Sequence, residues 1–193
     1  SKFLFVASKN GVMSIYCGDE IIVENCGSID DLIFSDDKKK YAYVSDQKKD
    51  NFVFVDGERS YGPFDSIERL FFPSYDKLYF FAKKDHVWDL YINGQAQNLN
   101  CETVTYFLPV GGEKYKAEAF FCIEKNQKWY VFFTDGRNAG PFDAMSFHIR
   151  HGEKTGDFAY VAINNGTNYI YRNNKKIAST SHFIDYINFS EDE

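Results

Sequence analysis

The sequence predicts an all-β protein, and within that class a five-bladed β-propeller made of four-stranded repeats. A pattern of about 39 residues recurs five times, which is within the size range of one propeller blade. Aromatic residues make up 19% of the 193 residues, and aromatic side chains favour the half-buried surface of a pleated sheet. Ala and Leu are scarce, and no long stretch has an apolar period of 3.6 residues. An all-β fold is therefore favoured over helical classes.

The strand that ends at a tight turn is the most regular part of the repeat. Its third residue is always apolar and its fourth is always aromatic. Every copy ends in a pair drawn from Gly, Asp and Asn, and such pairs accept positive φ and form two-residue hairpin turns. The five copies are residues 13–19, 51–57, 88–94, 130–136 and 168–174. Their aromatic residues are Tyr16, Phe54, Tyr91, Phe133 and Tyr171.

A second, more apolar run precedes each of these strands. Because these runs are apolar on both faces, each is expected to form a strand buried between two neighbouring sheets. The middle residue of each run is aromatic, and the five runs are residues 3–7, 41–45, 78–82, 119–123 and 158–162. Polar loops are expected to join the two runs at residues 8–11, 46–50, 83–86, 124–128 and 164–167.

A first strand is expected before each apolar run. Residues 28–35, 66–73 and 183–190 share a skeleton of Ile, two residues, Leu or Ile, one residue, then Phe. Residues 103–109 follow it more loosely. The fourth copy departs from it, because Met145, His148 and Arg150 stand where Ile, Leu and Phe stand elsewhere. A weaker fourth strand is expected after each tight turn, as at residues 58–64 and 137–142.

The order of these strands predicts a closed ring. The chain begins in the second strand of a repeat and ends with a first strand, so residues 183–190 are expected to pair with residues 3–7. This pairing would remove the open sheet edges that an unclosed array exposes. We therefore expect one domain over residues 1–193. Its repeats are residues 1–27 with 183–193, 28–65, 66–101, 102–143 and 144–182.

Short polar motifs beside these strands resemble the WD-like repeats of bacterial β-propellers. Residues 34–39 read Phe-Ser-Asp-Asp-Lys-Lys and are followed by Tyr-Ala-Tyr. Residues 72–77 and 189–192 are partial copies, and residues 150–154 depart from the motif. The pattern is similar to the repeats of the Tol-system periplasmic propeller and of dipeptidyl-peptidase-type propeller domains. The resemblance implies a ring that binds proteins or gates an attached catalytic domain, and a location in the cell envelope. Those relatives usually have more than five blades, so a truncated longer propeller stays an alternative.

Charge and composition exclude several function classes. The formal net charge is −6 and the pI is about 5.3, which disfavours nucleic acid as a partner. The basic run at residues 38–40 adjoins two Asp residues and is expected to be a solvated turn. No apolar stretch reaches 18 residues and no signal peptide is apparent, and the start at Ser1 rather than Met leaves targeting open. We expect a monomer without membrane insertion and without a metal or cofactor.

The four cysteines, Cys17, Cys26, Cys101 and Cys122, have no metal-ligand spacing. They are expected to be mainly small buried apolar residues. Thiols without a pairing pattern are typical of a reducing compartment, whereas the family resemblance favours the cell envelope. The compartment therefore stays open.

Candidate site residues fall into three groups. The first group is carboxylates at the starts of first strands, namely Asp30, Asp31, Glu68, Glu102 and Asp185. The second group is Trp88 and Trp129, which core packing explains most simply but which would be binding anchors if exposed. The third group is His148 and Arg150, which break the local apolar pattern, and such positions often mark function.

Two function classes follow from these residues. The first is a non-catalytic module that binds a protein or small ligand at a loop-lined channel mouth. The alternative is a five-bladed propeller that binds or hydrolyses glycans with paired channel carboxylates. Asp65 and Asp143 argue against the alternative, because in the repeated Gly-Pro-Phe-Asp motif an Asp is expected to accept hydrogen bonds from turn amides. A structural segment of a larger protein is a third hypothesis.

Overall fold

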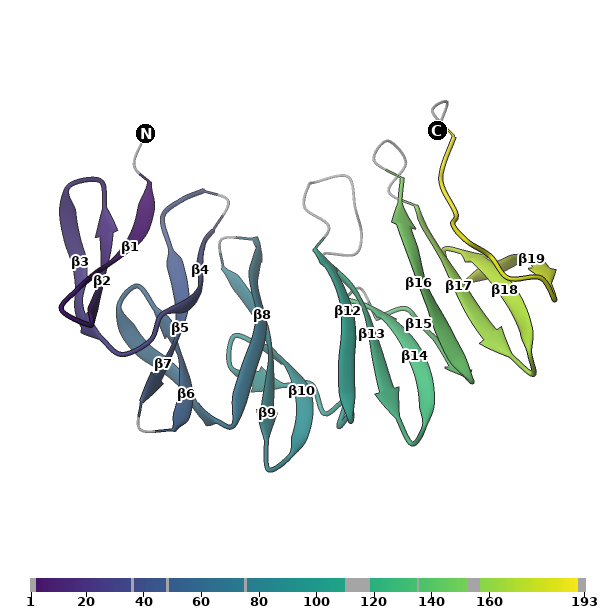
Figure 1. Cartoon of the computed structure of the whole chain (residues 1–193), viewed down its shortest axis with the longest axis horizontal. Helices are drawn as coiled ribbons and strands as arrows, with labels where there is room; N and C mark the ends of the chain where they lie inside the picture. Colours follow the sequence, from purple (N-terminus) through teal and green to yellow (C-terminus); the bar gives the residue numbers. More distant parts are fainter. Residues whose placement is uncertain are drawn as a thin grey trace. The chain divides into compact units, whose positions relative to one another are not determined.

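The chain folds as β-strands joined by short turns (Figure 1). The computed structural model describes residues 3–35, 37–47, 49–74, 76–109, 119–134, 136–152 and 157–190. These residues form antiparallel sheets in chain order, so the all-β prediction is confirmed. None of the described residues forms a helix that could cross a membrane. The chain divides into two compact units, residues 1–100 and 101–193.

The first unit contains three sheets. Sheet 1 has three strands, β1 (Leu4–Lys9), β2 (Val12–Cys17) and β3 (Glu20–Cys26). Sheet 2 contains β4 (Asp30–Phe34), β5 (Tyr41–Gln47), β6 (Asp50–Val55) and β7 (Glu58–Phe64). Sheet 3 contains β8 (Ser66–Ser74), β9 (Lys77–Lys84), β10 (Val87–Ile92) and the short β11 (Gln95–Ala96). In each sheet, every strand pairs with the next strand along the chain.

The second unit contains two sheets of four strands each. Sheet 4 contains β12 (Thr103–Pro109), β13 (Ala119–Lys125), β14 (Lys128–Phe133) and β15 (Asn138–Phe142). Sheet 5 contains β16 (Ala144–His151), β17 (Phe158–Asn164), β18 (Thr167–Arg172) and β19 (Lys175–Thr180). Residues 183–190, the tail, form no strand.

Most of the predicted tight turns are present, and side chains of the turn residues hold them. Asp56 and Asn93 both have positive φ, at 51° and 47°. The Asn93 side-chain oxygen accepts the Leu78 amide at 2.8 Å, and Asp56 accepts the Tyr41 amide at 3.0 Å. The turn residue thus ties the end of the third strand to the start of the second. This contact explains why Asp and Asn recur at the first turn position.

The joints between second and third strands are shorter than predicted. Polar loops of four or five residues were expected there, but most of the joints are two-residue turns with the strands continuing on both sides. Asn165 and Gly166, for example, have φ of 48° and 71°. A type I′ turn needs this backbone and matches the strand twist. These joints therefore offer less loop surface than the sequence suggested.

Each sheet carries a stacked aromatic pair between the strands that correspond to the second and third strands of the repeat, which in sheet 1 are β1 and β2. The rings are nearly parallel, with centroids 4.9–5.5 Å apart. Such pairs contribute about 0.5–1.5 kcal/mol beyond the area they bury. The pairs are Phe5–Tyr16, Tyr43–Phe54, Phe80–Tyr91, Phe121–Phe132 and Tyr160–Tyr171.

One member of these pairs differs from the sequence prediction. The sequence placed Phe133 at the repeat position of Tyr16, Phe54, Tyr91 and Tyr171, but in β14 the residue opposite Phe121 is Phe132. Phe133 instead lies in the core shared with sheet 5. The turn after β14 is longer, since the Phe133 amide bonds the Arg137 carbonyl across it. The expectation of a two-residue turn therefore placed the aromatic position at Phe133, one residue after Phe132.

The cores lie between consecutive sheets of a unit. Tyr43 and Phe54 of sheet 2 pack against Ile15 of sheet 1. The other side of sheet 2, its outgoing face, presents Ala42 and Val53 to sheet 3. The same alternation recurs between sheets 4 and 5. The second strands β5, β9 and β13 are therefore buried on both faces over most of their length, as their continuous apolar sequence predicted, whereas β1 is largely exposed.

The predicted pairing of residues 183–190 with residues 3–7 is not present in the structure. Sheet 1 has three strands, and the tail forms none. Ile187 and Phe189 of the tail instead line a pocket together with residues of the outgoing face of sheet 5. Burial of these two side chains does not require strand pairing, which is the physical reason for the difference.

The cysteines are all free thiols. Cys101 and Cys122 are buried, as predicted, and burial raises the pKa of the Cys122 thiol. Cys17 and Cys26 are half-buried. Burial also raises the pKa of the Cys26 thiol, although a hydrogen bond with Tyr43 partly offsets this effect.

Candidate functional site

The first strands share a β-bulge, and the bulge places polar side chains on the surface. In β4 the register shifts between Asp30 and Ile33, and in β8 it shifts between Glu68 and Phe71. Bulges re-aim side chains and are over-represented beside functional sites. The bulges of the first strands therefore form the candidate site.

The bulge residues of the first unit are exposed and charged. Asp31 and Arg69 are the equivalent residues, with φ of 50° and 61°. Asp30, Asp31, Glu68 and Arg69 are all exposed. Since β4 and β8 lie side by side, the structure brings the candidates Asp31 and Glu68 onto neighbouring strands.

His148 and Arg150 have a different explanation from the one the sequence suggested. In β16 the register shifts between Ser146 and Ile149, so the bulge holds one residue more than in β8. Ile149 is buried at 2% exposure and takes the place expected for position 148. His148 lies in the bulge, and the exposed Arg150 donates to the Ile149 carbonyl at 2.9 Å. The apparent break in the apolar pattern is therefore a one-residue insertion.

Glu102 is part of a turn contact that recurs at the starts of first strands. Its Oε1 accepts the Asn126 amide at 3.1 Å. In the same way Asp143 Oδ2 accepts the Asn165 amide at 2.7 Å, and Asp65 Oδ2 accepts the His86 amide at 3.2 Å. The predicted role of Asp65 and Asp143 in binding turn amides is confirmed, and Glu102 shares it.

Lys128 adds an ion pair to this contact at Asp143, with Nζ 2.5 Å from Oδ1. The Lys128 hydrogen bond lowers the pKa of the Asp143 carboxyl below its ordinary value, and the Asn165 amide lowers it further. Both effects stabilise the ionised form. A carboxylate held in this way is suited to fixing a turn and poorly suited to proton transfer at neutral pH.

Trp88 and Trp129 belong to the third strands β10 and β14, and Asp185 belongs to the tail. Trp129 is half-buried and packs against the core between sheets 4 and 5. Trp88 is half-buried in β10, opposite Lys83. Asp185 is exposed on the tail. Of the predicted site residues, only the carboxylates of β4 and β8 are therefore brought together within the first unit.

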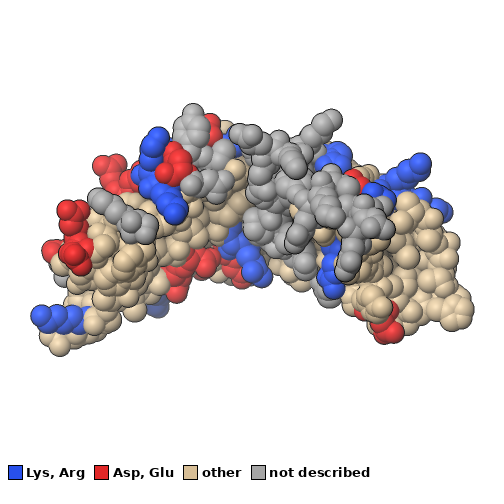
Figure 2. Space-filling model, turned by 90° about the horizontal axis from the view of Figure 1, so that it is seen from above, with Lys and Arg blue, Asp and Glu red and all other residues tan. Residues whose placement is uncertain are grey.

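The candidate site has the chemistry of a polar binding surface. Acidic and basic side chains are interspersed on the face seen in Figure 2. Within the described ranges, no three His, Cys, Asp or Glu residues are grouped so that they could hold a metal ion. Arg69 was missed by sequence reasoning. The available signal was the pair of consecutive polar residues inside each Ile-x-x-Leu skeleton.

The fold and the site define an all-β repeat protein with polar first strands. No known family model matches the chain, and no curated protein matches it either. The resemblance to WD-like propeller repeats therefore stays a prediction.

Among solved structures, the chain is similar to "Crystal structure of BBS1N in complex with ARL6DN, soaked with mercury". The TM-score is 0.40 and the sequence identity 9%, over 92% of this chain and 62% of that chain. This chain thus spans less than two thirds of the length of that neighbour.

Proposed function

We propose that the five sheets form the blades of one closed β-propeller domain in which the tail supplies the missing first strand of sheet 1. The burial pattern of the tail supports this proposal. Asp185 and Tyr186 are exposed between the half-buried Ile184 and Ile187. This pattern repeats that of β4 and β8, where the two bulge residues are exposed between apolar neighbours.

The exposed surface of sheet 1 also supports closure. Phe5 and Val6 in β1 are 38% and 39% exposed. Their equivalents in β5, Tyr43 and Val44, are 1% and 4% exposed. The exposed fractions differ because β5 pairs with the first strand β4 and packs against sheet 1, whereas β1 has neither neighbour within its unit. An added strand would cover the free edge of β1.

We infer that this protein is a non-catalytic binding module, with the first-strand bulges as its binding surface. The observation that carries this inference is the exposure of consecutive charged residues on the neighbouring strands β4 and β8. Asp30, Asp31 and Glu68 outnumber Arg69 there. The surface is therefore suited to a protein segment that carries Lys and Arg, because opposite charges favour encounter and orientation.

Glycan binding or hydrolysis is the second candidate function. The observation that favours it is again the placement of Asp31 and Glu68 on neighbouring first strands, since glycosidases use paired carboxylates. Glu102 does not contribute to such a pair, because its carboxylate is already bonded to a turn amide.

A peptide library graded by net charge tests the binding proposal. The wild-type chain is expected to select peptides rich in Lys and Arg, and the variant Asp31→Lys/Glu68→Lys is expected to lose at least about tenfold in affinity. Glu20→Lys/Glu58→Lys is the matched control, because it makes the same charge change on the exposed positions of β3 and β7.

Equal loss in both variants would mean that only the net charge matters, and it would overturn the proposed surface. Selection of glycans rather than peptides on an array would favour the second candidate function. Selection that is insensitive to both variants would overturn the first-strand surface altogether.

A further inference from the structure

The outgoing face of sheet 5 has the same construction as the outgoing face of sheet 2. Ala159 and Ile170 of sheet 5 stand at the repeat positions of Ala42 and Val53 in sheet 2. In the first unit, Ala42 and Val53 are buried at 0% exposure in the cluster that includes residues of β8. This face of the repeat is therefore built to receive a first strand.

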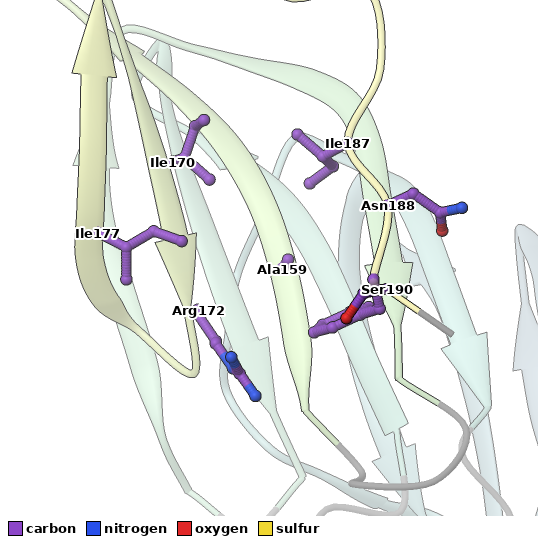
Figure 3. Close-up of a pocket in the computed structure, with 8 residues that line it drawn as sticks. Ala159, Ile170, Arg172, Ile177, Ile187, Asn188 and Ser190 are labelled. Atoms are coloured by element: carbon purple, nitrogen blue, oxygen red, sulfur yellow. The ribbon is translucent and has the colours of Figure 1, made fainter. Parts of the chain in front are cut away.

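The tail lies beside this face, and its apolar side chains match those of a first strand. Ile187 and Phe189 stand at the repeat positions of Leu70 and Phe72, which β8 contributes to the cluster with sheet 2. Figure 3 shows Ile187 and Ser190 on one side of a pocket and Ile170 of the sheet on the other. Residues two apart on an extended segment share one face, so an apolar-x-aromatic pattern fits this position.

The tail is less firmly held than β8. β8 pairs with β9 along its backbone, whereas residues 183–190 form no strand. A cavity of about 430 Å³ separates the tail from the sheet, and Ile177 at its wall is 56% exposed.

Arg172 adds a charged contact to this position. It stands at the repeat position of Val55, and its guanidinium carbon lies 5.7 Å from the centre of the Phe189 ring. Asp157 accepts a hydrogen bond from Arg172 Nε at 2.8 Å, which orients the guanidinium. A cation over an aromatic ring contributes roughly 0.5–1 kcal/mol at an exposed site.

We propose that this outgoing face is a docking groove for an extended peptide with the pattern Ile-x-Phe, and that the tail is a replaceable internal occupant. Side-chain burial supplies the affinity and the two-residue spacing supplies the specificity. The proposal does not depend on ring closure or on the first-strand binding surface, because the groove and the tail both belong to the second unit.

The test uses the full chain and a labelled peptide with the sequence of residues 183–190. The variant Ile187→Asp/Phe189→Asp, called the released variant, weakens the docking of the tail in the groove. The peptide is expected to bind this variant at least about tenfold more tightly than it binds the wild type, because a tethered competitor has a high effective concentration. A peptide with the same two Asp substitutions is the control and is expected not to bind.

A groove variant completes the design. Ile177→Asp, added to the released variant, is expected to weaken peptide binding about tenfold, because it places a charge on the apolar wall. Val12→Asp is the matched control, because Val12 is an exposed apolar residue of sheet 1, and it is expected to leave binding unchanged. Circular dichroism checks that each variant is folded, and Phe189→Ala alone serves if the double variant is not.

Equal peptide affinity for the wild type and the released variant would overturn the proposal. Binding of the Asp-substituted peptide, or equal effects of Ile177→Asp and Val12→Asp, would also overturn it.

Discussion

Two glycines in the repeated Gly-Pro-Phe-Asp motif adopt a backbone conformation that other residues avoid. Gly62 and Gly140 have φ of 131° and 128°. A Cβ on Gly140 would lie 2.8 Å from the Trp129 carbonyl oxygen and 2.9 Å from Tyr130 Cδ1. The motif is therefore fixed by backbone packing as well as by the turn hydrogen bonds of its Asp.

Gly140→Ala is expected to destabilise the fold by about 3 kcal/mol or more, because backbone atoms must move and φ becomes strained. Gly166→Ala is the matched control. Gly166 also has positive φ, at 71°, but nothing lies within 4 Å of the added Cβ. Its cost is expected to be about 1–2 kcal/mol. Urea unfolding of the two variants measures the difference, and equal costs would contradict the packing argument.

The side chain of Asn93 is predicted to hold its turn. Asn93→Gly keeps the positive φ accessible but removes the bonds to the Leu78 amide and the Asp76 carbonyl. The expected cost is about 1–2 kcal/mol in urea unfolding. Asn165→Gly changes a turn residue of similar φ that contributes its backbone amide to the Asp143 contact, and it is expected to cost less than about 0.5 kcal/mol. A similar cost for both would show that φ alone matters.

The carboxylate of Asp143 gives a pH-dependent prediction. Its pKa is lowered in the folded state, so its stabilising effect is present above the ordinary pKa of 3.8 and is lost as the pH falls through the lower folded value. The wild type is therefore expected to be more stable than Asp143→Asn near pH 7, and the difference is expected to shrink at acid pH. Unfolding midpoints between neutral and acid pH measure it. The gap is expected to narrow in a Lys128→Ala background, and an unchanged gap there would contradict the ion-pair explanation.

At the scale of the strand, sequence reasoning placed most elements well. Apolar periodicity and paired turn residues located the second and third strands of every sheet, because these strands are rich in apolar residues and most of the third strands end at turns that favour Asp, Asn or Gly. The insertion before Ile149 and the longer turn after Phe133 were not foreseen. A bulge or a turn with one extra residue does not alter the local composition. The strand position assigned by periodicity is then wrong by one residue, and nothing in the sequence marks the error.

Candidate-site residues were harder to predict for the same physical reason. The sequence singled out carboxylates by their position relative to strand starts, but it did not distinguish Glu102, which binds a turn amide, from Asp31 and Glu68, which are exposed at bulges. That distinction depends on which carboxylate side chain reaches the neighbouring turn to accept a hydrogen bond from its amide. It requires the register between strands, which the sequence does not encode locally.

At the scale of the whole molecule, ring closure makes a prediction about size. A closed domain of this length is expected to have a radius of gyration of about 16 Å. An open array exposes the apolar surface of sheet 1, including Phe3 at 63% and Ile21 at 46% exposure, and would be larger. Small-angle scattering of the wild type is therefore expected to give the compact value at every protein concentration tested.

The tail variant Ile187→Asp/Phe189→Asp tests whether the tail closes the ring, which a compact size alone does not establish. If the tail closes the ring, this variant is expected to show a larger radius of gyration and faster amide hydrogen exchange in β1, because β1 loses its outer partner. Ser179→Asp is the control for a charge placed on sheet 5, because Ser179 is exposed in β19 and does not line the pocket that holds the tail. A compact wild type with unprotected β1 amides would contradict closure, because the edge of sheet 1 would then be open in solution.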